Sequence, residues 1–266
     1  MRPPAVAGTF YPAEDAALQG MLLELTSFPP RQRRAILLVG PHAGYIYSGS
    51  VAGQLYRSVD LPDRFVILCP NHTGRGARFA IMSAGQWRTP LGTVPIDSAL
   101  ATRLKERCPL LEEDERAHAR EHSLEVHLPF LQFLHPGFTF VPICIGAASV
   151  SELQTLGEAI ADVVAGNAQQ ILLISSTDMT HYEPARVARQ KDDKALQAIL
   201  RLDGVGLYQA VERFAISMCG YAPTTAALFA AQRLGASQGE LVRYANSGDV
   251  TGDYGSVVSY AGIAIW

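Results

Sequence analysis

The feature that most constrains the fold of this chain is a series of short, continuously apolar runs rich in Val, Ile and Leu. Runs without alternating polar residues are typical of strands covered on both faces. Between these runs, other segments show the periodicity of amphipathic helices. The expected strands are Ala35–Val39, Phe65–Cys69, Phe138–Ile145, Ile171–Ser175, Leu241–Ala245 and Ser256–Ile265. The expected helices are Glu14–Thr26, Gly49–Arg57, Ser98–Glu106, Val150–Val164, Arg186–Arg201 and Thr224–Arg233.

Alternation of strands and helices predicts the α/β class, with a central, mostly parallel or mixed sheet flanked by helices. The stretch "FAIMSAGQWRTPLGTVPID" places glycines and prolines between short β-prone pieces, which predicts a hairpin or an edge extension of the sheet. No repeat and no linker-like change of composition divides the 266 residues. We therefore expect a single domain over residues 1–266.

Charge and hydropathy exclude several classes of partner. The 22 basic and 25 acidic residues are interspersed and give a net charge of −3, so no basic stripe is available for nucleic acid. The N-terminal "MRPPAVAGTFYPAEDAALQG" lacks the apolar core of a signal peptide, and no run approaches the roughly 18 apolar residues of a membrane span. We expect no nucleic-acid partner, no membrane partner and a cytoplasmic location.

Three histidines follow predicted strands. His42 comes after the first strand, His72 after the second and His181 after the strand ending at Ser175. Ligands of open α/β sheets bind at the carboxyl ends of the strands, where such side chains converge. Each histidine alone is compatible with an ordinary loop hydrogen bond, but three converging imidazoles suit metal binding or proton transfer.

The segment "EHSLEVHLPFLQFL" crowds His122, Glu125 and His127 ahead of an apolar helical run. Proline has no backbone N–H, so this helix must begin only a few residues before Pro129. The polar residues then lie at or near its N-terminus, either at a pocket edge or as a helix cap with a surface pair. The spacing is not the H-E-x-x-H of zinc proteases.

Cysteine spacing gives neither a disulfide framework nor a zinc knuckle, since Cys69, Cys108, Cys144 and Cys219 form no C-x-x-C pair. Cys219 precedes a helix expected to start near Pro223, and a helix N-terminus or a metal lowers the pKa of a thiol. It is therefore either a buried structural cysteine or a reactive one. The Gly-rich "NSGDVTGDYGS" does not match a calcium loop and predicts a turn between two strands. Nucleotide-binding and serine-hydrolase motifs are absent from the sequence.

Seven motifs in order along the chain carry a family resemblance: "RPPAVAGTFYP", "PHAGYIYSG", "PNH", "EHSLEVHLPFLQ", "SSTDMTHY", "MCGYAP" and "YANSGDVTGDYGSVVSYAGIA". With them the chain closely resembles the Memo family. That family is similar in fold to the catalytic subunit of class III, LigB-type extradiol dioxygenases, so the resemblance implies a LigB-like α/β fold. Prokaryotic members are often encoded with an AMMECR-type protein and a radical-SAM protein, which are the implied protein partners of this AmmeMemoRadiSam association.

The resemblance also implies roles for individual residues. His42 and His72 match two histidine ligands of a metal, and Cys219 matches the third ligand, where the dioxygenases have a glutamate. His181, with Asp178 nearby, matches an acid/base histidine. The implied metal is Fe(II), with copper or zinc as alternatives because a thiolate is a soft ligand. The residues expected to line a pocket for a small-molecule substrate or peptide are Tyr47, Asn71, His122, Glu125 and His127.

Three functions fit these residues. The first is a metal-dependent, dioxygenase-like oxidoreductase in which His181 transfers a proton. The second is a metal-binding or partner-binding protein without turnover, which the change to Cys219 favours. The third is a metal-free enzyme with Cys219 as nucleophile. The retained Asp178 and His181 favour the first, because a simple metal carrier would not need them.

Overall fold

The computed structural model describes residues 1–31, 33–167 and 170–266, and its described strands include a nine-stranded mixed sheet. The centre of the sheet consists of four parallel strands, in the spatial order β1, β8, β2 and β7. Their bounds are Leu37–Gly40 (β1), Ile171–Ser176 (β8), Arg64–Pro70 (β2) and Thr139–Ile145 (β7). These strands are almost completely buried, as their continuous apolar character predicts.

Antiparallel pairs extend the sheet on both sides of this centre. On one side β11 (Val257–Ile265) pairs with β1 and also with β10 (Gly239–Asn246) and β9 (His181–Glu183). On the other side β3 (Phe79–Ile81) pairs antiparallel with β7, and the two-residue β6 (Glu112–Glu113) then pairs parallel with β3. The α/β class with a mixed sheet is therefore confirmed.

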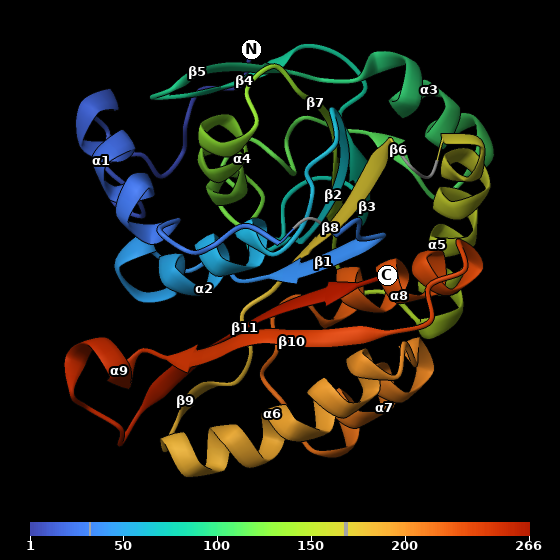
Figure 1. Cartoon of the computed structure of the whole chain (residues 1–266). Coiled ribbons are helices and arrows are strands. Elements are labelled where there is room, and N and C mark those ends of the chain that lie inside the picture. Colours follow the sequence, from blue (N-terminus) through green and yellow to red (C-terminus); the bar gives the residue numbers. More distant parts are fainter. Residues whose placement is uncertain (32, 168–169) are drawn as a thin grey trace.

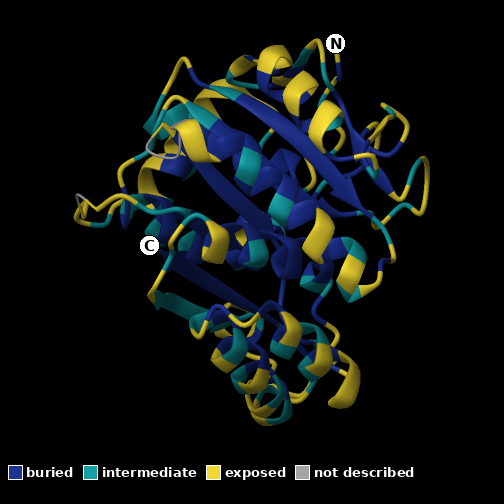
Figure 2. Cartoon of the chain, turned by 90° about the vertical axis from the view of Figure 1, so that its right-hand side faces the viewer, coloured by how far each residue is buried: buried dark blue, intermediate teal, exposed yellow. Residues whose placement is uncertain are grey.

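Helices cover both faces of the sheet, and the resulting layers are visible in Figure 1. The first core cluster lies between the sheet and α3 (Ser98–Arg107), α5 (Val150–Val164), α6 (Ala185–Leu200), α7 (Gly204–Arg213) and α8 (Tyr221–Arg233). The second lies under α1 (Asp15–Leu25), α2 (Tyr45–Arg57), α4 (Leu128–Leu134) and the hairpin of β4 (Gln86–Thr89) and β5 (Gly92–Pro95). Figure 2 shows the buried strands between helices that expose their outer faces.

Several local predictions are confirmed. The stretch around Gly85 forms the β4–β5 hairpin, and β3 extends the sheet. Helix α4 begins one residue before Pro129, after a short 3-10 turn, η1 (Glu125–His127). The Gly-rich tail links β10 to β11 and contains one helical turn, α9 (Gly248–Thr251), at the tip of the strand pair (Figure 1). None of the helices in the described residues combines the length and apolar character needed to cross a bilayer.

Other elements differ from the expectation. Helix α2 begins at Tyr45 instead of Gly49, because Gly44 is the N-cap and the Tyr45 ring is buried against Tyr11 and Phe130. Helix α7 was not expected, since its glycines lower helix propensity. The Asp203 carboxylate caps it by accepting the N–H of Gly206 at 2.7 Å. A second short 3-10 turn, η2 (Ala165–Asn167), follows α5.

Candidate metal centre

The candidate site lies at the carboxyl ends of three adjacent parallel strands. His42 follows β1, His72 follows β2, and His181 begins β9 after β8. Because β8 lies between β1 and β2, the loops that follow these strands converge, as the sequence predicted. They border a cavity of about 720 Å³. Its lining residues are Phe10, His42, Ala43, Gly44, Tyr47, His72, His122, Asp178, His181, Tyr182, Ser217, Cys219, Ser247, Thr251, Asp253, Ser256, Val258 and Tyr260.

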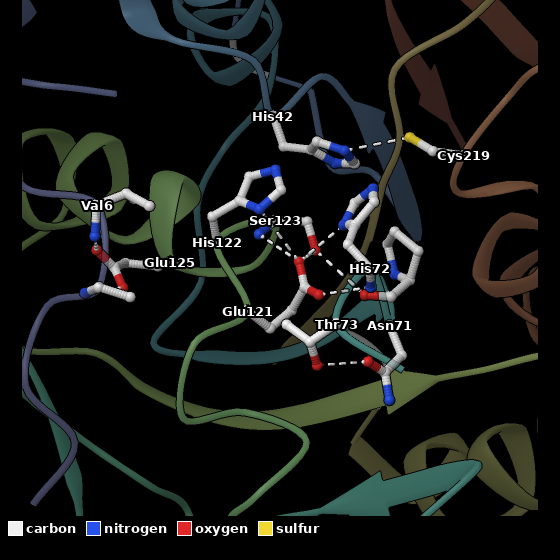
Figure 3. Close-up of polar contacts among 12 residues, drawn as sticks. Val6, His42, Asn71, His72, Thr73, Glu121, His122, Ser123, Glu125 and Cys219 are labelled. Carbon is white, nitrogen blue, oxygen red and sulfur yellow. Dashed lines mark hydrogen bonds and ion pairs between the residues drawn. The ribbon is translucent and has the colours of Figure 1, made fainter. Parts of the chain in front are cut away.

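Three histidines gather on one wall of this cavity. One ring nitrogen from each of His42, His72 and His122 lies within 4.8 Å of the other two. The ring centroids are 5.1 Å apart for His42 and His72 and 4.8 Å apart for His72 and His122, which stack. Figure 3 shows the three rings facing one another, with the Cys219 sulfur beside His42. The sequence placed His122 among the pocket residues, and the structure adds it to the group that can hold a metal ion.

The His42 ring is held in one tautomer by a serine hydroxyl. Ser176 Oγ donates to the carbonyl oxygen of Ser123 at 2.6 Å, so it can only accept from the two histidines that contact it. His42 Nδ1 donates to it at 2.7 Å, and His127 Nε2 donates at 2.8 Å. Burial, followed by the neighbouring His122 and His72, lowers the pKa of His42 well below its usual value, so the ring is neutral. Its Nε2 lone pair therefore faces the cavity.

His127 is fixed from its other side by a tyrosine. Its Nε2 donates to Ser176, so Nδ1 carries the lone pair in the neutral ring and accepts from the Tyr56 hydroxyl at 2.7 Å. Burial lowers the pKa of His127 to about 3. A directed chain of hydrogen bonds thus runs from Tyr56 through His127 to Ser176, the hydroxyl that orients His42. Outer partners of this kind fix the tautomer and direction of metal-binding histidines.

A buried carboxylate orients His72. Glu121 accepts from His72 Nδ1 at 2.8 Å and from the His72 backbone N–H at 2.6 Å, and Ser123 donates both its N–H and its hydroxyl. Burial opposes ionisation of Glu121, but the hydrogen bonds from His72 and Ser123 prevail and lower the pKa of that carboxyl to about 2. Because the ionised carboxylate accepts a hydrogen bond from Nδ1–H, the Nε2 atom of a neutral His72 ring carries the lone pair and is free to bind a metal.

Cys219 contacts His42 directly. Its Sγ atom lies 3.2 Å from His42 Nε2 and accepts the backbone N–H of Asp178 at 3.2 Å. Two donors that bind one ion at about 2.1 and 2.3 Å are at most about 4.4 Å apart, so this nitrogen and this sulfur fit a shared metal. Burial, followed by the Asp178 carboxylate, raises the pKa of the thiol above its usual value. A metal would displace the thiol proton, whereas a metal-free thiolate nucleophile is disfavoured.

Asp178 and His181 add two titratable side chains to the lining of the same cavity. Asp178 accepts the His42 backbone N–H at 2.8 Å, and burial raises the pKa of its carboxyl to about 6. His181 Nδ1 donates to the carbonyl oxygen of Ser217 at 2.9 Å, which leaves Nε2 as the lone-pair nitrogen of the neutral ring. Tyr47, also expected in the pocket, lines it as well.

The expectation that three other residues line the cavity is corrected, because the structure places them elsewhere. The Glu125 carboxylate is buried and accepts from Arg2 and from the Tyr11 hydroxyl. It also accepts backbone N–H groups of the N-terminal segment, and Figure 3 shows it beside Val6. His127 is buried outside the lining, where it bonds to Tyr56 and Ser176. The Asn71 amide donates to the Arg75 carbonyl oxygen at 2.7 Å. All three side chains therefore stabilise loops or orient other residues.

Sequence reasoning missed Glu121 and Ser176. Glu121 directly precedes His122, and its pairing with His72 joins two loops far apart in the sequence. Ser176 ends the apolar strand β8 and is fully buried there. A buried hydroxyl requires hydrogen-bond partners, so the serine at the end of this apolar run is a signal that could have pointed to Ser176.

Comparison with known proteins gives the family of the chain. The family model described as "Memo-like protein" matches residues 2–264. The chain belongs to this family. A MEMO1 family protein from Methanopyrus kandleri is 46% identical, with 98% of each chain covered, and one from Methanosarcina barkeri is 41% identical, with 100% of each covered.

A solved structure shows the same fold as this Memo-like protein. It is an uncharacterized protein from Escherichia coli K12, with a TM-score of 0.60 and 15% identity, over 85% of this chain and 98% of that one. At this identity the similarity concerns the fold alone.

Proposed function

We propose that this Memo-like protein is a metal-dependent oxidoreductase, related to the extradiol dioxygenases, whose ion is held by His42, His72 and Cys219. The observation that carries the proposal is that ring nitrogens of His42 and His72 lie within 4.8 Å of each other on this cavity, while the Cys219 thiol lies 3.2 Å from His42 Nε2. Each imidazole is oriented by an acceptor at Nδ1, which is the usual arrangement of metal-binding histidines. The same cavity contains Asp178 and His181.

The donor set suggests the metal. Imidazole suits zinc, copper and iron, and a thiolate disfavours the hard ions magnesium and calcium. We propose Fe(II), with copper or zinc as the alternatives. Fe(II) held by these residues would supply the redox chemistry that couples an organic substrate to dioxygen.

The protein's own residues would manage the protons. His181 presents Nε2 as a base for a substrate hydroxyl, while its Nδ1–H stays bonded to the Ser217 carbonyl oxygen. Asp178 holds the backbone at His42 through one oxygen, and its other oxygen lies 3.9 Å from His42 Nε2. General acid/base assistance of this kind contributes about 10²- to 10⁴-fold in rate.

Oxygen uptake tests the proposal. Protein loaded anaerobically with Fe(II) is mixed with dioxygen and each member of a panel of aromatic diols. We expect uptake above that of an equal amount of free iron with at least one compound. His181→Gln should keep its iron and lose about 10²- to 10⁴-fold in rate. Full activity in His181→Gln would remove this histidine from the mechanism.

A second candidate is a metal-binding protein without turnover. The observation that favours it is the thiol of Cys219, because a sulfur ligand increases affinity for soft metals. Stoichiometric metal together with no oxygen uptake for the whole panel would favour this candidate over the oxidoreductase.

A further inference from the structure

The described walls of the cavity carry acidic side chains and no permanently cationic ones. Among the described residues that line it are the carboxylates of Asp178 and Asp253, but neither a lysine nor an arginine. A ligand carboxylate or phosphate would therefore meet no lysine or arginine side chain of these walls. Since a buried anion requires a partner, the lining disfavours anionic ligands.

Aromatic rings form much of the remaining wall. Phe10, Tyr47, Tyr182 and Tyr260 line the cavity beside the histidines. Aromatic faces are electronegative, so they attract cations and stack on flat rings. The aromatic rings and the carboxylates thus both favour a ligand that carries a positive charge.

Tyr182 is held at this wall by an unusual backbone. Its φ is 58°, in the left-handed region, and its side chain is 78% exposed. The flanking residues His181 and Glu183 pair with β11, where the register shifts, and this pairing maintains the conformation. Left-handed backbone at a bulky residue is costly and persists where the surrounding structure imposes it. Here the residue with this backbone carries a large, mostly exposed ring, so packing in the core does not explain the conformation.

Asp253 provides a fixed negative charge in the loop between β10 and β11. Its Oδ1 atom accepts the Gly255 N–H at 2.8 Å, which holds the carboxylate in place. The same loop contributes Ser247, Thr251 and Ser256 to the lining, so the carboxylate lies on the side of the cavity formed by this loop.

We propose that the walls of this cavity favour small, ring-bearing molecules that are neutral or carry an ammonium group over their carboxylate counterparts. The ring packs among the tyrosines, and the ammonium group lies near Asp253. The volume of about 720 Å³ suits a small molecule. This inference deepens the proposed function by naming its ligand class, but it concerns binding and does not require turnover.

Calorimetric titration of the metal-free protein tests it, because no ion is then present to attract a carboxylate. The probes share a phenol ring and differ in charge: tyramine, 4-ethylphenol and 4-hydroxyphenylacetate. We expect tyramine to bind most tightly and 4-hydroxyphenylacetate most weakly. One exposed charge pair contributes about 1 kcal/mol. We therefore expect the Kd to rise about 5-fold from tyramine to 4-ethylphenol and about 5-fold again from 4-ethylphenol to 4-hydroxyphenylacetate. The preference should shrink in 0.5 M salt.

Two pairs of variants separate the contributions of the Asp253 charge and the Tyr182 ring to binding. Asp253→Asn should weaken tyramine about 5-fold and leave 4-ethylphenol unchanged. Asp60→Asn is the matched control: it makes the same charge change at an exposed position before β2, at the opposite end of that strand from His72. Tyr182→Leu should also weaken tyramine, whereas Tyr254→Leu, which removes an exposed tyrosine outside the lining, should not.

Two results would overturn the inference: binding of 4-hydroxyphenylacetate at least as tight as that of tyramine, or no binding of any probe at millimolar concentration. Either result leaves the oxygen-uptake experiment unaffected, because that experiment measures turnover of the iron-loaded protein. Failure of the oxidoreductase proposal would in turn leave the order of these three affinities unchanged.

Discussion

The Nδ1 atom of His42 lies 2.7 Å from the Oγ atom of Ser176, and it is the donor of this hydrogen bond. The direction follows from Ser176, whose own proton goes to a backbone carbonyl. A buried serine at the end of β8 therefore decides that His42 offers Nε2, and not Nδ1, to the cavity.

Removing this hydroxyl should weaken metal binding. In Ser176→Ala the His42 and His127 rings lose their common acceptor, and loss of such an outer partner typically costs 10- to 100-fold in metal affinity. A competition titration of zinc against a chromophoric chelator measures the change. Ser175→Ala is the control, because Ser175 is equally buried but bonds to Thr224. Equal affinities of the two variants would contradict the orienting role.

Each of the three proposed ligands should be required for stoichiometric metal. Protein expressed with iron, copper and zinc available is purified anaerobically and its metals are measured by elemental analysis. We expect near-stoichiometric metal in the wild type and loss of most of it in His42→Ala, His72→Ala and Cys219→Ala. His135→Ala should retain its metal, because His135 pairs with Asp63 outside the cavity lining. An empty wild type, or variants that keep their metal, would contradict the three-ligand site.

Arg2 should contribute far more to stability than a surface arginine. Its buried guanidinium pairs with Glu125, donates to the carbonyl oxygens of His118 and Glu121, and lies 4.0 Å from the Trp87 ring centre. Arg2→Ala leaves a buried carboxylate unpaired, so we expect a loss of about 3–5 kcal/mol in the free energy of unfolding.

Urea denaturation measures this loss, and the exposed pair of Arg31 and Glu240 provides the control. Arg31→Ala should cost less than about 1 kcal/mol, because exposed pairs are weak. Similar losses in Arg2→Ala and Arg31→Ala would show that the buried pair adds little.

The buried His118 should make the protein less stable in mild acid. Burial, followed by the charge of Arg2, lowers the pKa of His118 from 6.5 to about 4. As the pH falls from 6.5 to 4, the unfolded state takes up a proton here that the folded state does not bind. The free energy of unfolding therefore falls by up to about 3 kcal/mol, and the loss is complete near pH 4.

His118→Phe removes this titration and keeps a ring against Trp87. Urea denaturation of wild type and variant at pH 7 and pH 4.5 tests the expectation. Lowering the pH from 7 to 4.5 should reduce the free energy of unfolding of the wild type more than that of the variant. A difference that does not depend on pH would contradict the assignment.

Local pattern was sufficient for most of the fold and for part of the site. Continuous apolar runs marked the four parallel strands, and the rule for strand ends then brought His42, His72 and His181 to one cavity. Local pattern did not predict α7, where a cap at Asp203 offsets the low helix propensity of glycine. It also failed for Glu125, because spacing near a helix start does not say which way a buried side chain points.

The amino-acid sequence by itself determined which segments become strands, which residues follow them and the family to which the chain belongs, because periodicity and motif order are local properties. Only the tertiary structure decided that β8 lies between β1 and β2 and that His122 lies close enough to His42 and His72 to form a group that could hold a metal ion. The same holds for Glu121 and Ser176 as the acceptors that orient His72 and His42. These contacts join residues 49 and 134 positions apart, and their geometry depends on how the loops pack.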